Sequence, residues 1–126
     1  MKLLSELGEY VFDERDGEGL NPNRERRPPT KIKHDGEDAW YDGEWIIGTD
    51  IREGKGKMIH KYGFNECWFK NNLRAIRGRE IIPDGGYYLG QLDNDQMNGK
   101  GTLKLSYGFE YTGDWKDNCC HGHGCQ

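Results

Sequence analysis

Large aromatic residues alternate with small or polar ones in three similar segments of the chain. Residues 41–45 read Tyr-Asp-Gly-Glu-Trp, residues 88–92 read Tyr-Leu-Gly-Gln-Leu, and residues 111–115 read Tyr-Thr-Gly-Asp-Trp. A period of two places the first, third and fifth side chains on one face of a β-strand and the others on the opposite face. The pattern therefore predicts strands with one aromatic face, on which the central glycine leaves room for neighbouring rings.

A Gly-x-Gly pattern recurs after a predicted turn. In the third copy we expect it to open a second strand over residues 101–107, with Leu103, Leu105 and Tyr107 on one face. Each copy is therefore expected to form a β-hairpin. The copies of the pattern are Gly54/Gly56, Ile76/Gly78, Gly99/Gly101 and Gly122/Gly124.

The glycines keep a regular period along the chain. The second glycines of the pattern lie at positions 56, 78, 101 and 124, so the spacings are 22, 23 and 23 residues. A further glycine follows seven residues later, at positions 63, 85 and 108, where glycine permits the positive φ of a tight turn. One hairpin cannot bury its aromatic face alone, whereas stacked hairpins can, so the period predicts a solenoid-like array.

This combination of motifs resembles the MORN repeat family, and the resemblance covers residues 41–126. It implies an all-β fold: an elongated, single-layer antiparallel sheet of tandem MORN β-hairpins with a concave groove. Residues 1–40 are expected to form an N-terminal arm and linker that is mostly irregular, because Pro28-Pro29 interrupts regular structure. The predicted copies span residues 41–63, 64–87 (degenerate), 88–110 and 111–126 (incomplete).

Two copies depart from the family pattern. In the second copy, residues 64–68 fit best, which puts Glu66 at the glycine position with an ambiguity of a residue or two. The first copy carries a two-residue insertion, which we place in the turn around Thr49 to Arg52. Upstream, Gly17-Glu18-Gly19 is either a decayed fifth repeat or part of an extended arm that orders only on a partner.

The composition suits a thin structure with solvent on both sides. Only 33% of residues are hydrophobic and 32% are charged, whereas the 12% of aromatic residues argue against disorder. The net charge of −4 is uneven, because residues 22–33 carry +4 and the segments before and after them carry −4 each. The repeats therefore lack the basic footprint of a nucleic-acid-binding domain. The basic run from Arg24 to Lys33 is either a solvated linker or a contact for an acidic partner or a membrane surface.

The chain shows no targeting signal that we can identify. No apolar stretch approaches the roughly 20 residues that span a bilayer. The segment Met1–Leu7 is too short and too acidic for a secretory signal or a mitochondrial presequence. Four cysteines without a secretory signal indicate a reducing compartment, so we expect a cytoplasmic location.

The tail Cys119–Cys125 has the ligand types of a metal site, because thiolates and imidazoles suit zinc. Its spacing departs from that of structural zinc sites, and His121-Gly122 stands where MORN repeats commonly carry a His-Gly turn. We therefore expect no metal and no cofactor. Cys67 is either buried or a surface thiol. The chain carries no recognisable nucleophile–base arrangement, phosphate loop or zinc-protease motif, so we expect no enzyme activity.

The aromatic residues of the repeats are the first candidates for partner binding. They are expected to lie along one stripe, where they either pack the sheet or in part line a groove for a partner helix or peptide. The aromatic candidates are Tyr41, Trp45, Trp68, Tyr88, Tyr111 and Trp115. The glycines expected at structural turn positions are Gly43, Gly54, Gly56, Gly63, Gly78, Gly85, Gly90, Gly99, Gly101, Gly108, Gly113, Gly122 and Gly124.

Four cations in the degenerate copy are candidates for binding acidic phospholipid or an acidic protein surface. Glu66, Glu80 and Asp84 lie near them in the sequence and nearly cancel their charge, so this is the weaker alternative. The cations are Lys70, Arg74, Arg77 and Arg79.

The last copy ends two residues after Gly124 and so lacks most of its second strand. We expect a second protein, or a second copy of this chain, to add a strand to this open edge, and the competing explanation is a truncated chain. The chain resembles short, repeat-only MORN subunits of ciliary axonemes, and of radial spokes in particular. This implies a non-catalytic structural subunit of a cytoskeletal or ciliary assembly. The alternative is a peripheral membrane adaptor that binds acidic phospholipid.

Overall fold

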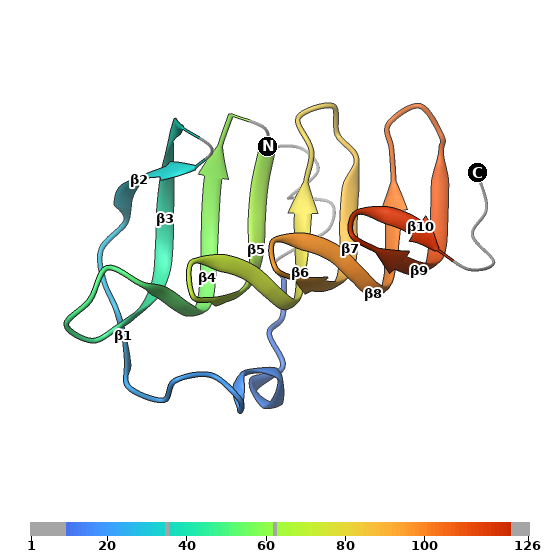
Figure 1. The fold of residues 1–126 in the computed structure, drawn as a ribbon. Coiled ribbons are helices and arrows are strands. Elements are labelled where there is room, and N and C mark those ends of the chain that lie inside the picture. The colour runs from blue at the N-terminus through green and yellow to red at the C-terminus, as the bar shows by residue number, and fades with distance from the viewer. Residues whose placement is uncertain (1–9, 35, 62, 122–126) are drawn as a thin grey trace.

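A single antiparallel sheet contains all the strands of the computed structural model, which describes residues 10–34, 36–61 and 63–121 (Figure 1). Strands β3 to β10 follow one another in chain order, so each pairs with its sequence neighbours. The predicted all-β array of hairpins is therefore confirmed. The strands are β1 (Arg24–Arg26), β2 (Thr30–His34), β3 (Glu37–Ile46), β4 (Arg52–His60), β5 (Gly63–Lys70), β6 (Leu73–Ile81), β7 (Tyr87–Asp93), β8 (Gln96–Lys104), β9 (Glu110–Lys116) and β10 (Cys119–His121).

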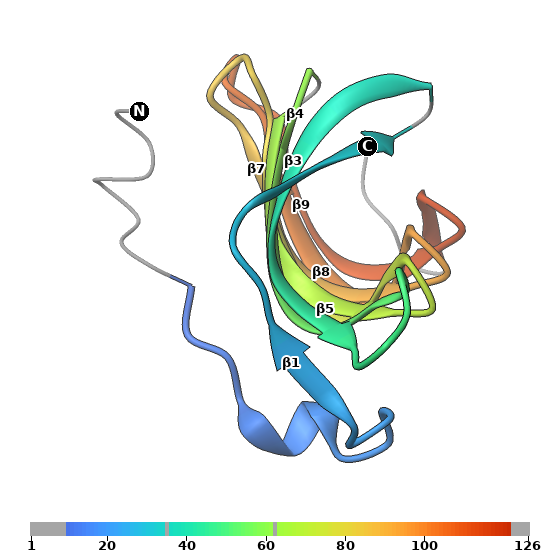
Figure 2. The ribbon, with the colours of Figure 1, turned by 90° about the vertical axis from the view of Figure 1, so that its left-hand side faces the viewer.

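The sheet is curved, and the two faces carry different side chains. Figure 2 shows the strands stacked along one common curve, with residues 10–20 outside it. The face on the inside of the curve, here called the concave face, carries Tyr41, Tyr88 and Tyr111. Side chains alternate between the two faces along each strand, so the residue after each tyrosine, such as Leu89, lies on the outer face, here called the convex face. The curvature lets a single layer bury the rings of its inner face.

The buried apolar side chains form one continuous cluster along the concave face. Ile32, Met97, Leu103 and Phe109 pack partly buried against it. The cluster consists of Ala39, Tyr41, Trp45, Met58, Cys67, Phe69, Tyr88, Leu92, Tyr111 and Trp115. In the described ranges, no helix has the length and apolar character needed to cross a membrane.

The sheet begins earlier in the chain than the repeats predicted. β1 and β2 lie within the arm that was expected to be mostly irregular, and both pair with the edge of β3 that faces away from β4. The arm prediction is corrected in this respect. Ile32 of β2 packs against the buried cluster, and exposed ion pairs accompany the added strands: Arg26 lies 2.6 Å from Asp42, and Lys33 lies 2.6 Å from Asp38.

Gly17-Glu18-Gly19 does not form a decayed repeat. Gly17 ends the 3₁₀ helix η1 (Glu14–Gly17), which begins after Asp13. The Asp13 carboxylate accepts a hydrogen bond from the Arg15 backbone N–H at 3.0 Å, as an N-cap residue does. Gly17 lies close to the Trp68 ring of the sheet, so this part of the chain lies against its own repeats.

The second strand of each hairpin starts before the Gly-x-Gly pattern, which corrects the predicted strand boundaries. β8 begins at Gln96 and ends at Lys104, so Leu105 and Tyr107 lie outside it and Tyr107 is 75% exposed. The turn before β8 has only two residues, Asn94 and Asp95, both with positive φ. A turn of this type matches the twist of a hairpin, and the strand resumes at once. The first hairpin has a longer connection, residues 47–51, which confirms the predicted insertion.

Candidate functional site

A column of small residues crosses the middle of the sheet, with one residue on each strand from β3 to β9. Pairing in register connects every member to the next, from strand to strand. Most of the glycines predicted at turns therefore lie inside strands, and of those predicted glycines that the structure describes, Gly85 and Gly108 lie in turns. The column consists of Gly43, Gly56, Cys67, Gly78, Gly90, Gly101 and Gly113.

Tyrosine rings lie across this column. The Tyr88 hydroxyl donates a hydrogen bond to the backbone carbonyl of Gln91 at 2.7 Å. Its ring passes over Gly90 and Gly101, and a Cβ atom at Gly101 would overlap it. The glycines are therefore required by the close approach of the ring. The same bond recurs from Tyr41 to Glu44 (2.8 Å) and from Tyr111 to Asp114 (2.8 Å).

The second copy fills the column differently. Cys67 pairs with both Gly56 and Gly78, so it takes the glycine place and Asn65 takes the tyrosine place. The predicted alignment, with Glu66 at the glycine, is wrong by one residue. Asn65 has no ring to cover the column, and the Cys67 side chain lies in the vacated space against Gly78. Burial raises the pKa of the Cys67 thiol, so the buried alternative is confirmed for this cysteine.

The same register places Trp68 on the convex face, so the prediction of one aromatic stripe is wrong for this residue. The other five aromatic candidates lie together on the concave face, where none is more than 5% exposed. Their rings meet edge to face, with centroids 5.2 Å apart for Tyr41 and Trp45 and 5.6 Å apart for Tyr88 and Trp115. This burial favours the packing alternative, and a role in partner binding stays a prediction.

The first position of Gly-x-Gly lies at a β-bulge. Gly54 and Gly99 have φ values of 109° and 84°, and the strand register shifts beside each of them. In the second copy Ile76 takes this position with φ of 68°. Positive φ is a costly conformation for a β-branched residue. The pattern thus combines a bulge glycine with a glycine under the tyrosine ring.

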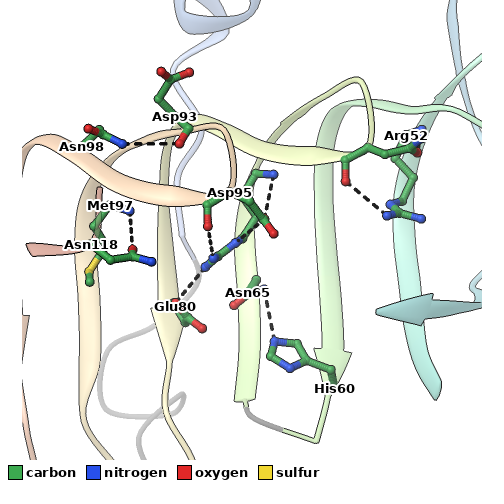
Figure 3. A network of polar contacts seen from close by, with 11 residues as sticks. Arg52, His60, Asn65, Glu80, Asp93, Asp95, Met97, Asn98 and Asn118 are labelled. Carbon is green, nitrogen blue, oxygen red and sulfur yellow. Dashed lines mark hydrogen bonds and ion pairs between the residues drawn. The ribbon is translucent and has the colours of Figure 1, made fainter. Parts of the chain in front are cut away.

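The two-residue turns form a ladder that sequence reasoning missed. The Asn118 backbone N–H donates to the carbonyl of Met97 at 3.0 Å, and its side-chain oxygen accepts from the Met97 N–H at 2.7 Å (Figure 3). Asp95 makes the same two bonds to Arg74, and Asn72 makes them to Arg52. The turn of each of these hairpins is thereby hydrogen-bonded to the second strand of the preceding hairpin. The signal was available in the sequence as Asn71-Asn72, Asn94-Asp95 and Asp117-Asn118, spaced 23 residues apart.

The four cations of the second copy do not form one patch. Arg74 lies on the concave face, between Glu80 and Asp95 at 2.8 Å from each. Arg79 lies on the convex face, where it forms a buried ion pair with Glu66 at 2.6 Å. Arg77 also lies on the convex face and pairs with an acid of the N-terminal arm, while Lys70 is exposed.

The basic run near the N-terminus is not a solvated linker. Arg24 lies 3.7 Å from Glu44, and Arg27 lies 2.9 Å from Glu25 and stacks 4.9 Å from the centre of the Trp45 ring. These contacts fix β1 against the edge of β3.

Residues 10–17, here called the docked segment, lie on the convex face. Phe12 packs edge to face on Trp68 with ring centroids 5.5 Å apart, and Tyr10 packs on Phe12 at 4.9 Å. Gly17 closes over the same tryptophan, where a Cβ atom would overlap the ring. Burial raises the pKa of Tyr10 to about 12. Trp68 therefore serves as the aromatic anchor for a segment of the chain's own polypeptide.

Acidic residues complete this contact. Asp16 pairs with Arg77 at 3.3 Å, and Glu14 pairs with Lys55. Lys55 and Arg77 are the middle residues of the first two Gly-x-Gly patterns, which point outward on the convex face. The sheet thus holds a short acidic segment, which includes the 3₁₀ helix η1, through aromatic packing and ion pairs.

A family model for the MORN repeat matches residues 88–106 and 111–126. The chain contains MORN repeats. The matched residues are the third and fourth copies, and the glycine column extends the same register through the first two. MORN repeats are generally non-catalytic repeats that bind proteins or membranes.

Curated relatives contain a similar segment. The chain is 31% identical to Alsin of Homo sapiens and of Mus musculus over 93 residues, and 30% identical to Alsin of Rattus norvegicus over 95 residues. Each match covers 69% of this chain and 6% of the relative. The chain thus spans only about 6% of the length of these relatives.

The structure does not describe every candidate. Gly122, Gly124 and the end of the cysteine–histidine tail lie outside the described residues, as does the proposed open edge after β10. Within the described ranges, no three His, Cys, Asp or Glu side chains are grouped as a metal site would require.

Proposed function

We propose that this MORN-repeat chain is a non-catalytic scaffold subunit that assembles proteins on its sheet. The observation that carries the proposal is the docked segment. Phe12 and Tyr10 pack on Trp68, and the adjoining acids pair with outward-facing cations of the repeats. The convex face is thereby suited to holding polypeptide, whereas the concave face is filled by its own rings.

We place this scaffold in a cytoskeletal or ciliary axonemal complex of the cytoplasm, such as a radial spoke. The support is the likeness to short, repeat-only MORN chains of axonemes. The contacts of the four cations give no support to the alternative, an adaptor for acidic phospholipid. Three of the four are paired with acids, and they are divided between the two faces.

Detergent fractionation of the tagged protein in a ciliated cell tests this proposal. We expect the protein to stay with the detergent-insoluble cytoskeleton and to leave it in high salt, because ion pairs at exposed surfaces are screened. Proteins released with it are then identified by mass spectrometry. If detergent alone frees the protein together with membranes, the scaffold proposal is wrong and the lipid adaptor takes its place.

A further inference from the structure

The docked segment covers only the N-terminal half of the convex face. Phe12 lines a small hollow there together with Asp42, Lys55, Gly56 and Lys57, which belong to the first copy. In the third copy, Leu89 follows the tyrosine as Asp42 does in the first. The residues that correspond to Lys55, Gly56 and Lys57 are Lys100, Gly101 and Thr102.

These four residues of the third copy line a groove of about 480 Å³. Thr112 of β9 also lines the groove, and so do Tyr10 and Val11 of the docked segment. Leu89 is 43% exposed and Val11 is 84% exposed, so the groove presents apolar surface to solvent. The groove is therefore the repeat-equivalent of the hollow beside Phe12, and the docked segment borders it through Tyr10 and Val11.

The charges of the groove follow the same repeat. The middle residues of the first two Gly-x-Gly patterns, Lys55 and Arg77, pair with acids of the docked segment. The middle residue of the third is Lys100, which forms an ion pair with Asp114 of the neighbouring strand while its side chain stays 76% exposed. The exposed ammonium of Lys100 can therefore contact an incoming acid as well as Asp114, at the position where the earlier copies hold an acid of the docked segment.

We propose that the groove over the third and fourth copies binds a short acidic segment of a partner protein that carries an aromatic side chain. The aromatic ring packs on Leu89 between Thr102 and Thr112, and a carboxylate pairs with Lys100. The proposal rests on the scaffold function above and names the surface and the partner chemistry. The occupant is another protein rather than a second copy, because each chain's own acidic segment is already docked on its first two copies.

The chain supplies the probe for this chemistry. A fluorescein-labelled peptide with the sequence of residues 10–18, Tyr-Val-Phe-Asp-Glu-Arg-Asp-Gly-Glu, has the required ring and acids. It is titrated with the full chain and its anisotropy is measured. We expect saturable binding that weakens as salt is raised.

Variants show where the peptide binds. Leu89→Glu and Lys100→Glu place a like charge in the groove and should weaken binding on the order of tenfold or more. Ile59→Glu is the matched control, because Ile59 is an apolar residue of the convex face outside the groove and is 54% exposed. We expect this variant to bind like the wild type. Circular dichroism melting confirms that each variant is folded.

A charge reversal completes the test. A peptide with lysine in place of its three acids nearest the ring should bind Lys100→Glu better than the wild type. If the peptide fails to bind, or binds Leu89→Glu as tightly as wild type, the groove proposal is overturned. Retention of the wild-type protein with the detergent-insoluble cytoskeleton would then still support the scaffold function, so the two proposals fail separately.

Discussion

Replacing Ile76 tests whether the backbone of β6 is strained at the bulge. Ile76 has φ of 68°, whereas the same position is glycine in the first and third copies, with φ of 109° and 84°. A left-handed conformation costs an L-residue about 1–2 kcal/mol, and glycine adopts it without that cost. The second copy therefore carries a penalty that the other two described copies avoid.

The comparison of Ile76→Gly with Ile76→Ala isolates this penalty, because both variants remove the isoleucine side chain. At an ordinary strand position glycine is less stable than alanine by about 0.5–1 kcal/mol. At position 76 the conformational cost of alanine exceeds that difference. We expect Ile76→Gly to be more stable than Ile76→Ala by about 1 kcal/mol.

Ile59 provides the matched control. It is an isoleucine within β4, and its φ is not positive. Ile59→Gly should therefore be less stable than Ile59→Ala. Urea unfolding followed by circular dichroism measures all four variants, and a difference of about 1 kcal/mol moves the midpoint by about 0.5–1 M. If alanine is as stable as glycine at position 76, the bulge is not strained and the explanation of Gly-x-Gly is wrong.

Three further predictions concern the turn ladder, the buried thiol and the tyrosines. Asp95→Ala removes the acceptor of the Arg74 N–H and guanidinium, so we expect a loss of about 2 kcal/mol in the free energy of unfolding, measured by urea denaturation. Asp95→Asn should lose less, because asparagine holds the same place at position 72. In a variant with serine at positions 119, 120 and 125, the Cys67 thiol should be alkylated by iodoacetamide at pH 8 only as fast as the protein unfolds, measured by mass spectrometry. Burial raises the pKa of Tyr88 to about 12, so the folded state keeps a proton that the unfolded state releases near pH 10, and stability should fall as pH rises through this range.

Each of these predictions has a result that contradicts it. Equal stability of Asp95→Ala and wild type would show that the ladder bond contributes nothing. Alkylation of Cys67 in the folded protein at the rate of a free thiol would show that it is accessible. For the pH prediction, Tyr88→Phe is the control: it should lose less stability between pH 10 and pH 12 than the wild type, and an identical profile would exclude Tyr88 as the titrating group.

The repeating part of the fold could be predicted because it is set by local pattern. The Tyr88 ring lies across Gly90 of its own strand and Gly101 of the next strand, so both positions must be glycine. The spacing of these three residues in the sequence therefore indicates the packing. The sequence displays that combination of tyrosine and glycines three times, in the first, third and fourth copies. The hairpin array and its period follow from it.

The second copy was misaligned because it has the same strand register as the other copies but different residue types at the tyrosine and glycine positions. Cys67 fills the room that a tyrosine ring takes elsewhere, and this exchange is visible only once the strand register is known. The shift of one residue moved Trp68 to the opposite face, since side chains alternate along a strand. The docked segment was missed for the same reason, because Trp68 is its anchor.

The edge strands could not be predicted because their contacts are with β3 and not with a repeat of their own. The residues of β1 and β2 read as a basic linker broken by two prolines. They form strands by pairing with β3, and Arg27 stacks on the Trp45 ring while Ile32 packs against the buried cluster. Charge patterns in the sequence do not reveal which partner they meet.

The most direct test of the central claim, that the convex face of this sheet holds partner proteins, is detergent extraction of two variants in a ciliated cell. Leu89→Glu changes the groove, and Ile59→Glu changes an exposed apolar residue of the same face outside it. We predict that Leu89→Glu passes into the detergent-soluble fraction while Ile59→Glu stays with the cytoskeleton like the wild type. Retention of both variants, with Leu89→Glu folded, would contradict the claim that partners bind in this groove.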